Sequence, residues 1–439
     1  MKNKSHLIYY LNVIIPAVFL FLLGSFSIIF PGPGVSLVEK RKLSPVPKLS
    51  LKAIFKEKYM DSLDLYFADN FASREAFVKL SFKLKQNRGI HSDEVAIYHP
   101  TENSTTIHEN TDTSKVNLSD TTNAVAVNDT TEGESSKGVF ILKGRALELF
   151  GGSQKMSTLY AEMVNEYYEK LKDSVRVFDL IVPSAAEFYL SEKYKKLSNP
   201  EKPIIDTIYS QLNKGVISVD AYSEIASHKN EYIYFNTDHH WTGLGAYYGY
   251  KAFCKSAGIV PMKMEQMEKR TRKDFLGSLY WLTRDEKLKE SGDSVDYFVY
   301  PGKFTTVKYV KKNQSKALPA SLFVEFAEGA NCYSVFLGAD YPLMKTETGL
   351  KNGKRVLVVK NSYGNPFATL MAAHYEQVFI VDYRYYSGGL LDLIKENKIT
   401  DVIFINGVFS ANTPSHIKDT KNLMYGKVAT VKTTKKIKG

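Results

Sequence analysis

The residues best suited to chemistry stand together in NTDHHWTGLG, residues 236–245. The carboxylate of Asp238 comes two residues before His240, and His239 stands between them. In an extended segment, side chains two residues apart lie on one face, so Asp238 could orient the His240 imidazole as a base. The same three residues could instead hold a metal ion. A third interpretation is an ordinary turn.

A serine that could work with this base occurs in VLVVKNSYGN, residues 356–365. A turn from a buried strand into a helix exposes the Ser362 hydroxyl and leaves backbone N–H groups free to stabilise an oxyanion. Serine is a weak nucleophile unless a neighbouring base, usually histidine, takes its proton. Ser362, His240 and Asp238 therefore form a possible triad, although an ordinary helix cap also explains a serine at this place.

The segments that must position these residues alternate between strand and helix. Apolar, β-rich runs predict strands at 175–183, 215–220, 232–235, 355–362, 377–384 and 401–406. Helical patterns predict helices at 153–174, 204–214, 243–258, 366–375 and 390–397. This order predicts an α/β fold with a mostly parallel sheet. Both reactive groups follow predicted strands, where such sheets bind ligands.

The remaining segments predict the domain layout. Residues 37–100 form a lead-in that is extended at first and then helical to about residue 85. Residues 101–138 are rich in Ser, Thr and Asn without an apolar period, which predicts a disordered or surface insertion. The α/β domain covers 139–425, with an inserted β-rich hairpin or flap near 260–350, and a basic tail covers 426–439.

The N-terminal stretch, residues 1–36, predicts the location of the protein. Residues 7–30 contain no charged side chain and are long enough to cross a bilayer as a helix. Lys2 and Lys4 precede them, which favours a cytoplasmic N-terminus. No small-residue cleavage site follows. The expectation is an uncleaved single-pass membrane anchor and an extracytoplasmic catalytic domain.

Composition limits the class of partner. A hydrophobic content of 44% supports a packed core, and 29 tyrosines suit either carbohydrate surfaces or core edges. The net charge is +11, but no basic motif is interleaved with aromatics, so nucleic-acid binding is not predicted. A basic surface that faces a membrane is favoured instead. The only two cysteines, Cys254 and Cys332, could form one disulfide or remain buried thiols.

The segment TDHHW, residues 237–241, is the signature of the bacterial DHHW protein family. That family is similar to the periplasmic alginate O-acetyltransferases of the SGNH (GDSL-like) hydrolase superfamily. Further segments resemble the same family: RKLSPVPKLS, DNFASRE, LIVPSAAEFY, DFLGSLYWLT, YSVFLGADYPL, VLVVKNSYGN and VDYRYY. The resemblance covers most of the chain except the Ser/Thr-rich insertion and the basic tail. It implies an SGNH-hydrolase-like three-layer sandwich of permuted topology, because the D-x-H pair precedes the serine.

The resemblance also assigns roles residue by residue. The family's D-x-H pair falls on Asp238 and His240, and its serine nucleophile falls on Ser362. A downstream D-x-R falls on Asp382 and Arg384, where the arginine would hold the substrate or the developing oxyanion. Related sequences often have an aspartate where this chain has Asn361, which puts the local geometry of the turn in question.

Other residues near the motifs have a functional and a structural interpretation. Tyr363, Asn365 and the backbone of Gly277 could donate to an oxyanion. Helix entry, with Asn365 as N-cap before Pro366, or a plain turn at Gly277 explains them equally well. His239 is expected to face away from the triad, packing or binding substrate. Trp241 could wall the site or stack on a sugar. Two further polar residues look structural: Asp401 and Asn406.

Together these features predict a membrane-anchored serine O-acetyltransferase or acetylesterase. It would modify a cell-surface or secreted polysaccharide through an acetyl-serine intermediate, without a cofactor. The resemblance implies a membrane-bound O-acyltransferase as the acetyl donor. Two alternatives remain. One is a non-catalytic polysaccharide-binding or assembly protein on the same fold. The other is a metal-dependent hydrolase with Asp238, His239 and His240 as ligands, although adjacent histidines rarely reach one metal.

Overall fold

The computed structural model describes residues 14–18, 21–22, 35–36, 41–42, 44–47, 57–71, 77, 80, 95–98, 136–310 and 313–426. The chain divides into two units, residues 1–92 and 93–439. Predictions for residues 101–135 and for the tail from 427 onward lie outside the described residues. Residues 136–138, predicted as the end of the insertion, belong to a strand.

The first unit joins two of the segments that resemble the DHHW family. Strands β1 (Val35–Ser36) and β2 (Arg41–Lys42) pair antiparallel, and α3 spans Glu57–Asn70. Ser44 donates from its N–H and its hydroxyl to Asp69 Oδ2, each at 2.8 Å. Asn70 Nδ2 donates to the Ser44 carbonyl at 2.8 Å. The SPVP segment is therefore held against the C-terminal end of α3. Beyond Asn70, only residues 71, 77 and 80 of the predicted lead-in helix are described.

The prediction of a single-pass membrane anchor needs correction. Within the described ranges, no helix is both long enough and apolar enough to cross a bilayer. The prediction rested on residues 7–30, of which the structure describes only 14–18 and 21–22. The structure therefore does not support a membrane-spanning helix at residues 7–30. The membrane location that was inferred from this run is not supported either.

The second unit is built on an eight-stranded sheet in the order β11-β10-β12-β14-β13-β15-β6-β7. Strands β14, β13, β15, β6 and β7 are parallel, whereas β12, β10 and β11 are antiparallel. Their bounds are β6 Arg176–Val182, β7 Val216–Ser218, β10 Phe304–Val310, β11 Asn313–Ala320, β12 Leu343–Thr348, β13 Arg355–Lys360, β14 Gln377–Asp382 and β15 Asp401–Gly407. The predicted mostly parallel sheet is confirmed, and β10, β11 and β12, which come from the predicted β-rich insertion, form its antiparallel part.

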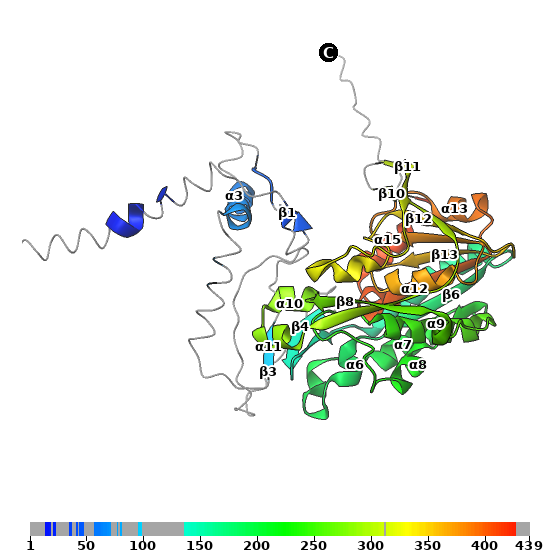
Figure 1. The fold of residues 1–439 in the computed structure, drawn as a ribbon, viewed down its shortest axis with the longest axis horizontal. Helices are drawn as coiled ribbons and strands as arrows, with labels where there is room; N and C mark the ends of the chain where they lie inside the picture. The colour runs from blue at the N-terminus through cyan, green and yellow to red at the C-terminus, as the bar shows by residue number, and fades with distance from the viewer. Residues whose placement is uncertain are drawn as a thin grey trace, which may run out of the picture. The chain divides into compact units, whose positions relative to one another are not determined.

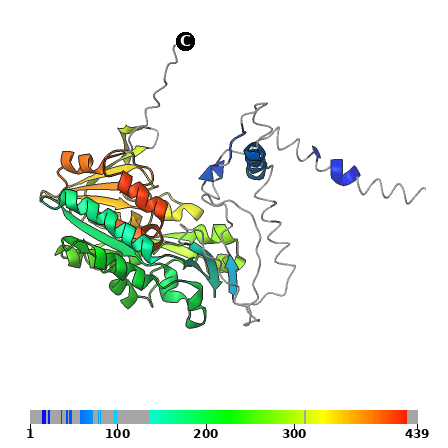
Figure 2. The same ribbon diagram turned by 180° about the vertical axis from the view of Figure 1, so that it is seen from behind.

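Helices cover both faces of this sheet, which gives three layers (Figures 1 and 2). One face packs against α5 (Gln154–Leu171), α7 (Glu201–Gln211), α13 (Leu390–Glu396), α14 (Val408–Ala411) and α15 (Pro414–Asn422). The other packs against α6 (Ala185–Tyr189), α8 (Ala221–Ser227), α9 (Gly243–Ala257) and α12 (Gly364–Met371). Successive residues of β13 alternate between the two cores, Val356 and Val358 against Leu357 and Val359, as strand geometry requires. Covering on both faces explains the continuous apolar runs.

Two smaller sheets flank this sandwich. Strands β3 (Val95–Tyr98), β4 (Ser136–Leu142) and β5 (Arg145–Phe150) form an antiparallel sheet. Strands β8 (Glu268–Phe275) and β9 (Asp293–Val299) pair antiparallel. The segment that connects them contains α10 (Ser278–Thr283) and α11 (Glu286–Ser291). Three short 3₁₀ helices complete the described elements: η1 Glu192–Leu197, η2 Met264–Gln266 and η3 Gly329–Val335.

Local signals fix several boundaries. The Ser153 side chain caps α5 by accepting the Met156 N–H, and Gly258 ends α9 in the left-handed conformation. Arg176 forms a fork with both oxygens of Asp401, at 2.7 and 2.9 Å, which ties β6 to β15. The structural role predicted for Asp401 is thus confirmed. Cys254 and Cys332 are both buried, and no disulfide joins them.

A buried polar cluster connects α5 to the sheet. The Tyr160 hydroxyl donates to Asp179 Oδ1 at 2.8 Å, and Asn406 Nδ2 donates to the Tyr160 oxygen at 3.1 Å. Within the described part of the chain, Asp179 Oδ2 and Asn406 Oδ1 have no hydrogen-bond partner. Burial raises the pKa of Asp179 to about 7, because a charge is costly inside the core. Asn406 is structural, as predicted.

We expect Asp179→Asn to stabilise the protein, and more so as the pH rises. The folded protein retains a proton on Asp179 that the unfolded chain, with an ordinary pKa of 3.8, releases. The free energy of unfolding of the wild type therefore falls between about pH 4 and pH 7, by at most about 4 kcal/mol. Thermal unfolding at about pH 5 and about pH 8 measures the gain, with exposed Asp206→Asn as control. An equal gain at both pH values contradicts the assignment.

Candidate active site

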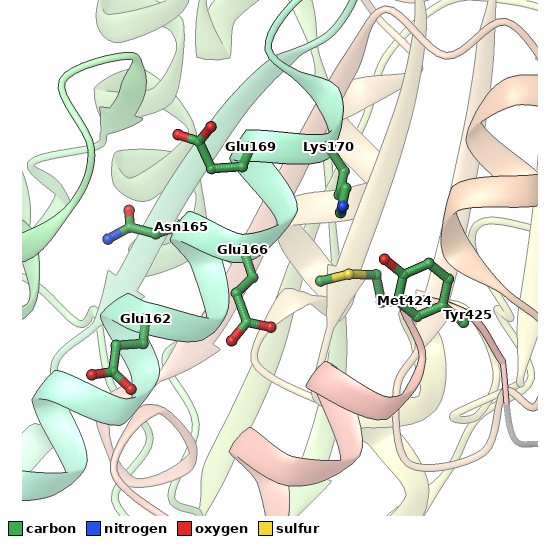
Figure 3. A pocket seen from close by; sticks show the side chains of 7 residues that line it. All are labelled: Glu162, Asn165, Glu166, Glu169, Lys170, Met424 and Tyr425. Atoms are coloured by element: carbon green, nitrogen blue, oxygen red, sulfur yellow. The ribbon is translucent and has the colours of Figure 1, made fainter.

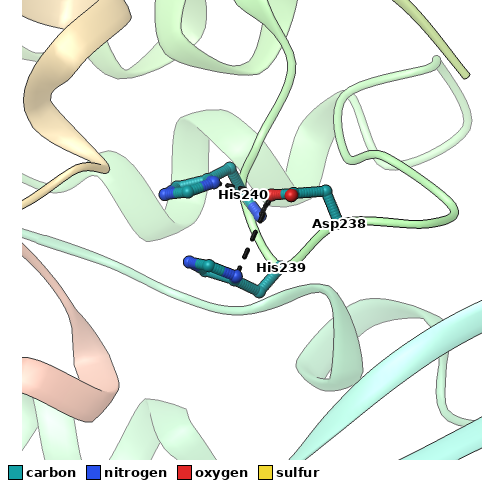
Figure 4. Close-up of side chains that lie close together, drawn as sticks. All are labelled: Asp238, His239 and His240. Atoms are coloured by element: carbon teal, nitrogen blue, oxygen red, sulfur yellow. Dashed lines mark hydrogen bonds and ion pairs between the residues drawn. The ribbon is translucent and has the colours of Figure 1, made fainter. Parts of the chain in front are cut away.

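Asp238, His240 and Ser362 meet in one continuous chain of hydrogen bonds, called here the Asp–His–Ser chain. His240 Nδ1 lies 2.6 Å from Asp238 Oδ1, and His240 Nε2 lies 2.7 Å from Ser362 Oγ. Figure 4 shows the Asp238 carboxylate beside both imidazole rings. Asp238 and His240 are buried, whereas Ser362 is only partly buried. The structure therefore brings together three residues that the sequence places up to 124 positions apart.

The loop that carries Asp238 and His240 differs from its prediction. Residues 232–235 do not form a strand, and they pair with the chain only through a single bridge from Tyr234 to Trp241. Residues 236–240 form successive bends instead of an extended segment. The His240 N–H donates to Asp238 Oδ1 at 3.0 Å, and this side-chain turn brings the two groups together. Local hydrogen bonding, not strand alternation, places the pair.

A buried carboxylate outside the motif holds this loop in place. Asp293, the first residue of β9, accepts the N–H groups of Asn236 at 2.8 Å and Thr237 at 2.7 Å. It also accepts the hydroxyls of Thr237 and Tyr232. Burial raises the pKa of Asp293, while these hydrogen bonds oppose that rise. No sequence pattern marks Asp293, because its partners lie more than 50 residues away.

Gly277 and Ser278 support the far side of Asp238. The Gly277 N–H donates to Thr237 Oγ1 at 2.8 Å, and the Ser278 N–H donates to Asp238 Oδ2 at 2.7 Å. The predicted role of Gly277 as an oxyanion donor is therefore wrong, since its N–H is already engaged. Gly277 instead gives Asp238 room. A Cβ at this position would lie 2.2 Å from Asp238 Cβ and 2.5 Å from Oδ2.

We expect Gly277→Ala to displace the Asp238 carboxylate and to cost on the order of 10²-fold or more in turnover. The φ angle of Gly277 is −83°, so alanine brings only a steric conflict and no backbone strain. Hydrolysis of 4-nitrophenyl acetate measures the loss. Gly258→Ala is a poor control because Gly258 has a positive φ, whereas Gly349 has open space around its Cβ position. Gly349→Ala should retain wild-type turnover. Equal turnover in both variants would show that Asp238 tolerates the shift.

Ser362 stands in a tight turn between β13 and α12. Asn361 Oδ1 accepts the Tyr363 N–H at 3.1 Å, and Asn361 Nδ2 donates to Ser410 Oγ at 2.8 Å. Asn361, which departs from the family pattern, thus stabilises the turn through both its amide oxygen and its amide nitrogen. The turn is close enough that a Cβ on Gly364 would lie 2.5 Å from Lys360 Cβ.

The predicted helix entry is shifted by two residues. Helix α12 begins at Gly364 with Tyr363 as N-cap residue, so Asn365 and Pro366 lie inside the first turn. Asn365 is therefore not an N-cap, and its Nδ2 donates to Asp340 Oδ1 at 3.1 Å. The Tyr363 N–H is also engaged, as described above. Among the described residues no acceptor is found for the Ser362 N–H, which leaves this group available to an oxyanion.

The His240 ring is packed between aromatic neighbours. Tyr333 stacks on it with ring centroids 4.2 Å apart and planes 11° apart, and the Tyr333 hydroxyl donates to the Ser362 carbonyl at 2.9 Å. Trp241 is fully buried, and its Nε1 donates to the Tyr363 carbonyl at 2.9 Å. The prediction that Trp241 could stack on a sugar is therefore wrong. The role of Tyr333 was missed, although YSVFLGADYPL begins with it.

The sequence suggested that His239 faces away from the triad, but its ring lies beside that of His240. Their ring centroids are 3.9 Å apart, and His239 Nδ1 lies 2.6 Å from Ser278 Oγ. The Tyr363 hydroxyl donates to the His239 carbonyl. Partial burial and the neighbouring His240 lower the pKa of His239 to about 4. His239 is therefore neutral near neutral pH and has no contact with Ser362.

Arg384 is fixed in a network of buried charges. Its Nε and Nη2 contact Asp382 at 2.9 and 2.7 Å, and Nη2 also lies 2.7 Å from Asp340 Oδ2. The buried Lys360 ammonium contacts the same two carboxylates at 2.9 Å each. Burial alone would raise the pKa of Asp340, but Lys360 and Arg384 hold it well below its usual range. Arg384 is close enough to His239 to contribute to lowering its pKa.

Asp238 remains ionised in this environment. Burial opposes its charge, but the attraction of His240 and His239 and the hydrogen bonds from His240 and Ser278 outweigh burial. They hold the pKa of Asp238 well below its usual range. A charged carboxylate against Nδ1 stabilises an imidazolium, and it leaves Nε2 of the neutral ring free to accept a proton from Ser362. This arrangement can activate a serine hydroxyl.

Comparison with known proteins identifies the family. Residues 91–381 match the family described as DHHW protein. The chain belongs to the DHHW protein family. A crystal structure of a DHHW family protein from Eubacterium siraeum DSM 15702 is 33% identical, with a TM-score of 0.61. The match covers 68% of this chain and 99% of that chain. A search of curated proteins gave no match.

The fold of this DHHW protein is shared more widely. The structure of Bacillus cereus PatB1 with a sulfonyl adduct is 16% identical, with a TM-score of 0.55. This match covers 64% of the present chain and 97% of the PatB1 chain. The O-acetyltransferase domain of Pseudomonas putida AlgJ is 12% identical over 64% of this chain and 96% of its own, with a TM-score of 0.37. The PatB1 likeness shows a common mixed α/β fold.

A metal ion fits this DHHW site poorly. Asp238, His239 and His240 offer ligand atoms within 4.8 Å of one another. However, His240 Nδ1 is hydrogen-bonded to Asp238 Oδ1, and His239 Nδ1 is bonded to Ser278 Oγ. His240 Nδ1, which carries a proton toward Asp238, has no lone pair for a metal, and His240 Nε2 is engaged with Ser362 Oγ. The donor set suits a hydrogen-bonded base better than a metal centre.

A surface cavity of about 400 Å³ lies away from the Asp–His–Ser chain, between α5 and the residues that follow α15 (Figure 3). Three glutamates of α5 line it together with four other residues: Glu162, Asn165, Glu166, Glu169, Lys170, Met424 and Tyr425. Lys421 pairs with Glu166 at its edge. None of the predicted site residues lines this cavity.

Proposed function

We propose that this DHHW protein is a serine O-acetyltransferase or acetylesterase that acts on a polysaccharide through an acetyl-serine intermediate. The observation that carries the proposal is the Asp–His–Ser chain, with bonds of 2.6 and 2.7 Å on the two nitrogens of His240. A buried, charged carboxylate, a correctly oriented imidazole and a serine at a strand-to-helix turn are the parts that serine acyl transfer needs.

The chemistry follows from these positions. His240 Nε2 takes the Ser362 proton as Oγ attacks the acetyl carbonyl carbon of the donor. The Ser362 N–H stabilises the resulting oxyanion. The carbonyl re-forms, the donor's leaving oxygen departs with the proton from His240, and an acetyl ester remains on Ser362. Attack by a sugar hydroxyl completes a transfer, whereas attack by water completes a hydrolysis.

The acceptor and the donor are part of the proposal. We propose a polysaccharide as acceptor, on the resemblance of the sequence motifs to those of the alginate O-acetyltransferases. A membrane-bound O-acyltransferase is proposed as the acetyl donor, on the family resemblance alone. Arg384, held by Asp340 and Asp382, is proposed to contact the substrate through the guanidinium nitrogen that those carboxylates leave unbonded.

Pre-steady-state hydrolysis of 4-nitrophenyl acetate tests the proposal. A rapid release of nitrophenol equal to the enzyme concentration, followed by slower turnover, is expected if Ser362 is acetylated. The same reaction is repeated with a chelator. Turnover that is lost with the chelator and returns with a divalent metal would replace this proposal by metal-dependent hydrolysis. Absence of any burst or turnover would favour a binding protein on the same fold.

A further inference from the structure

His239 has a position that the proposed chemistry leaves without a role. Its side chain is 31% exposed, whereas that of His240 is 7% exposed. It stands beside the base, not in the Asp–His–Ser chain, and it is held at one ring nitrogen and at its backbone carbonyl. Ser278 Oγ holds Nδ1 at 2.6 Å, and Tyr363 holds the backbone carbonyl. A partly exposed, immobilised imidazole next to a reacting serine is suited to contact a substrate.

The two imidazoles point in the same direction. Asp238 Oδ1 lies 2.6 Å from Nδ1 of His240 and 3.9 Å from Nδ1 of His239. The rings are 3.9 Å apart and inclined by 37°. With both Nδ1 atoms toward one carboxylate, both Nε2 atoms lie on the opposite side, as Figure 4 shows. His240 Nε2 contacts Ser362 Oγ there, so His239 Nε2 borders the place where an acceptor must attack.

The hydrogen-bonding capacity of His239 matches a hydroxyl. In the described part of the chain, no partner is found for its Nε2. Ser278 Oγ can donate to Nδ1 or accept from it, so Nε2 either donates or accepts. A sugar hydroxyl can take both roles, whereas a carboxylate only accepts and an ammonium only donates. The lowered pKa of His239 keeps its ring neutral beside His240, which must become an imidazolium during the reaction.

We propose that His239 binds the acceptor through Nε2, by holding the hydroxyl next to the one that attacks the acetyl group. The inference rests on the proposed function and names its acceptor class: sugars with two hydroxyls on neighbouring ring carbons. One hydroxyl contacts His240 Nε2, and the neighbouring hydroxyl contacts Nε2 of the adjacent His239 imidazole. An acceptor with isolated hydroxyls engages only His240.

The transfer step balances with these residues. The acceptor oxygen attacks the carbonyl carbon of acetyl-Ser362, and its proton passes to His240 Nε2. A new C–O bond joins the acetyl group to the acceptor. The bond between the acetyl carbon and Ser362 Oγ breaks, and Oγ takes the proton from His240. His239 exchanges no proton in this step. Water needs no second contact, so loss of His239 should favour hydrolysis over transfer.

The test measures how acetyl-enzyme partitions between an acceptor and water. 4-Nitrophenyl acetate supplies the acetyl group, and methyl glucoside or methyl 3-deoxyglucoside accepts it; the deoxy sugar has no neighbouring hydroxyl pair. The ratio of acetylated sugar to acetate does not depend on how fast the acetyl-enzyme forms. Wild type should favour methyl glucoside. His239→Ala should lower its ratio about tenfold and abolish the preference, as expected when one specific hydrogen bond is lost. Ser278→Ala, which keeps the N–H to Asp238, should lower the ratio less.

His228→Ala is the matched control. His228 is 28% exposed, stacks on Tyr248 and lies at the end of α8, away from the site. Its variant should keep the wild-type ratio. An unchanged ratio in His239→Ala, equal use of both sugars by wild type, or no capture by methyl glucoside would overturn the inference while the burst leaves the proposed function intact. A missing burst in wild type would overturn both.

Discussion

Ser362→Ala is expected to lower the rate of acetyl transfer and of 4-nitrophenyl acetate hydrolysis on the order of 10⁴-fold or more. The substitution removes the hydroxyl oxygen that lies 2.7 Å from His240 Nε2. The residual rate would come from the oxyanion donor and from substrate binding, which survive the substitution. The loss should fall on kcat, because no covalent intermediate can form.

The fold should tolerate this change. Ser362 is only partly buried, and the bonds that brace its turn come from Asn361 and from the Ser362 carbonyl, not from Oγ. Thermal unfolding of Ser362→Ala should therefore match wild type. Ser410→Ala is a useful comparison, because Ser410 contacts Asn361 on the other side of the turn. It should perturb stability more than chemistry. Turnover of Ser362→Ala within tenfold of wild type would exclude Ser362 as nucleophile.

Asp238→Asn is expected to lower turnover on the order of 10³- to 10⁴-fold while the fold persists. The carboxylate accepts three hydrogen bonds: two from His240 and one from the Ser278 N–H. An asparagine amide cannot satisfy all three donors. If its NH₂ group faces Ser278, the amide N–H and the Ser278 N–H are two donors directed at each other. If it faces His240, Nδ1 must act as acceptor, so the proton lies on Nε2 and the ring cannot take the Ser362 proton.

The same kinetic assay measures this loss, and Asp220→Asn provides the control, since Asp220 caps α8 away from the site. Asp220→Asn should keep wild-type kcat, and it should fold normally because an asparagine oxygen can still accept the Ser223 N–H. An Asp238→Asn enzyme that retains a tenth of wild-type turnover would show that the carboxylate only packs against His240. Circular dichroism of both variants distinguishes a catalytic defect from misfolding. A variant that keeps the wild-type spectrum and loses only kcat has a catalytic defect.

The sequence predicted the sheet well because the parallel strands are covered on both faces. Their continuous apolar runs, as in β6 and β13, carry a strong local signal. The prediction was wrong for residues 232–235, where Ile233, Tyr234 and Phe235 are fully buried without forming a strand. Burial creates the apolar pattern in both cases, and only long-range pairing distinguishes them.

The site was predictable where a sequence motif marked the residue, as for Ser362, and unpredictable where no local pattern did. Asp238 and His240 stand two apart, so their pairing could be inferred from spacing. Asp293 holds the loop that carries them and Tyr333 stacks on His240, both from distant positions that no local pattern marks. Gly277 was noticed for its backbone N–H, but its value lies in the missing Cβ, which only the neighbouring Asp238 reveals.

Direct detection of the acetyl-enzyme is the most decisive measurement. The protein is mixed with 4-nitrophenyl acetate, quenched in acid during the burst, digested and analysed by mass spectrometry. The account predicts one acetyl group on the peptide that contains Ser362, its absence in Ser362→Ala, and its accumulation in a variant with slowed transfer. Turnover of wild type without an acetylated Ser362, or acetylation at another residue that forms and decays at the rate of turnover, would contradict it.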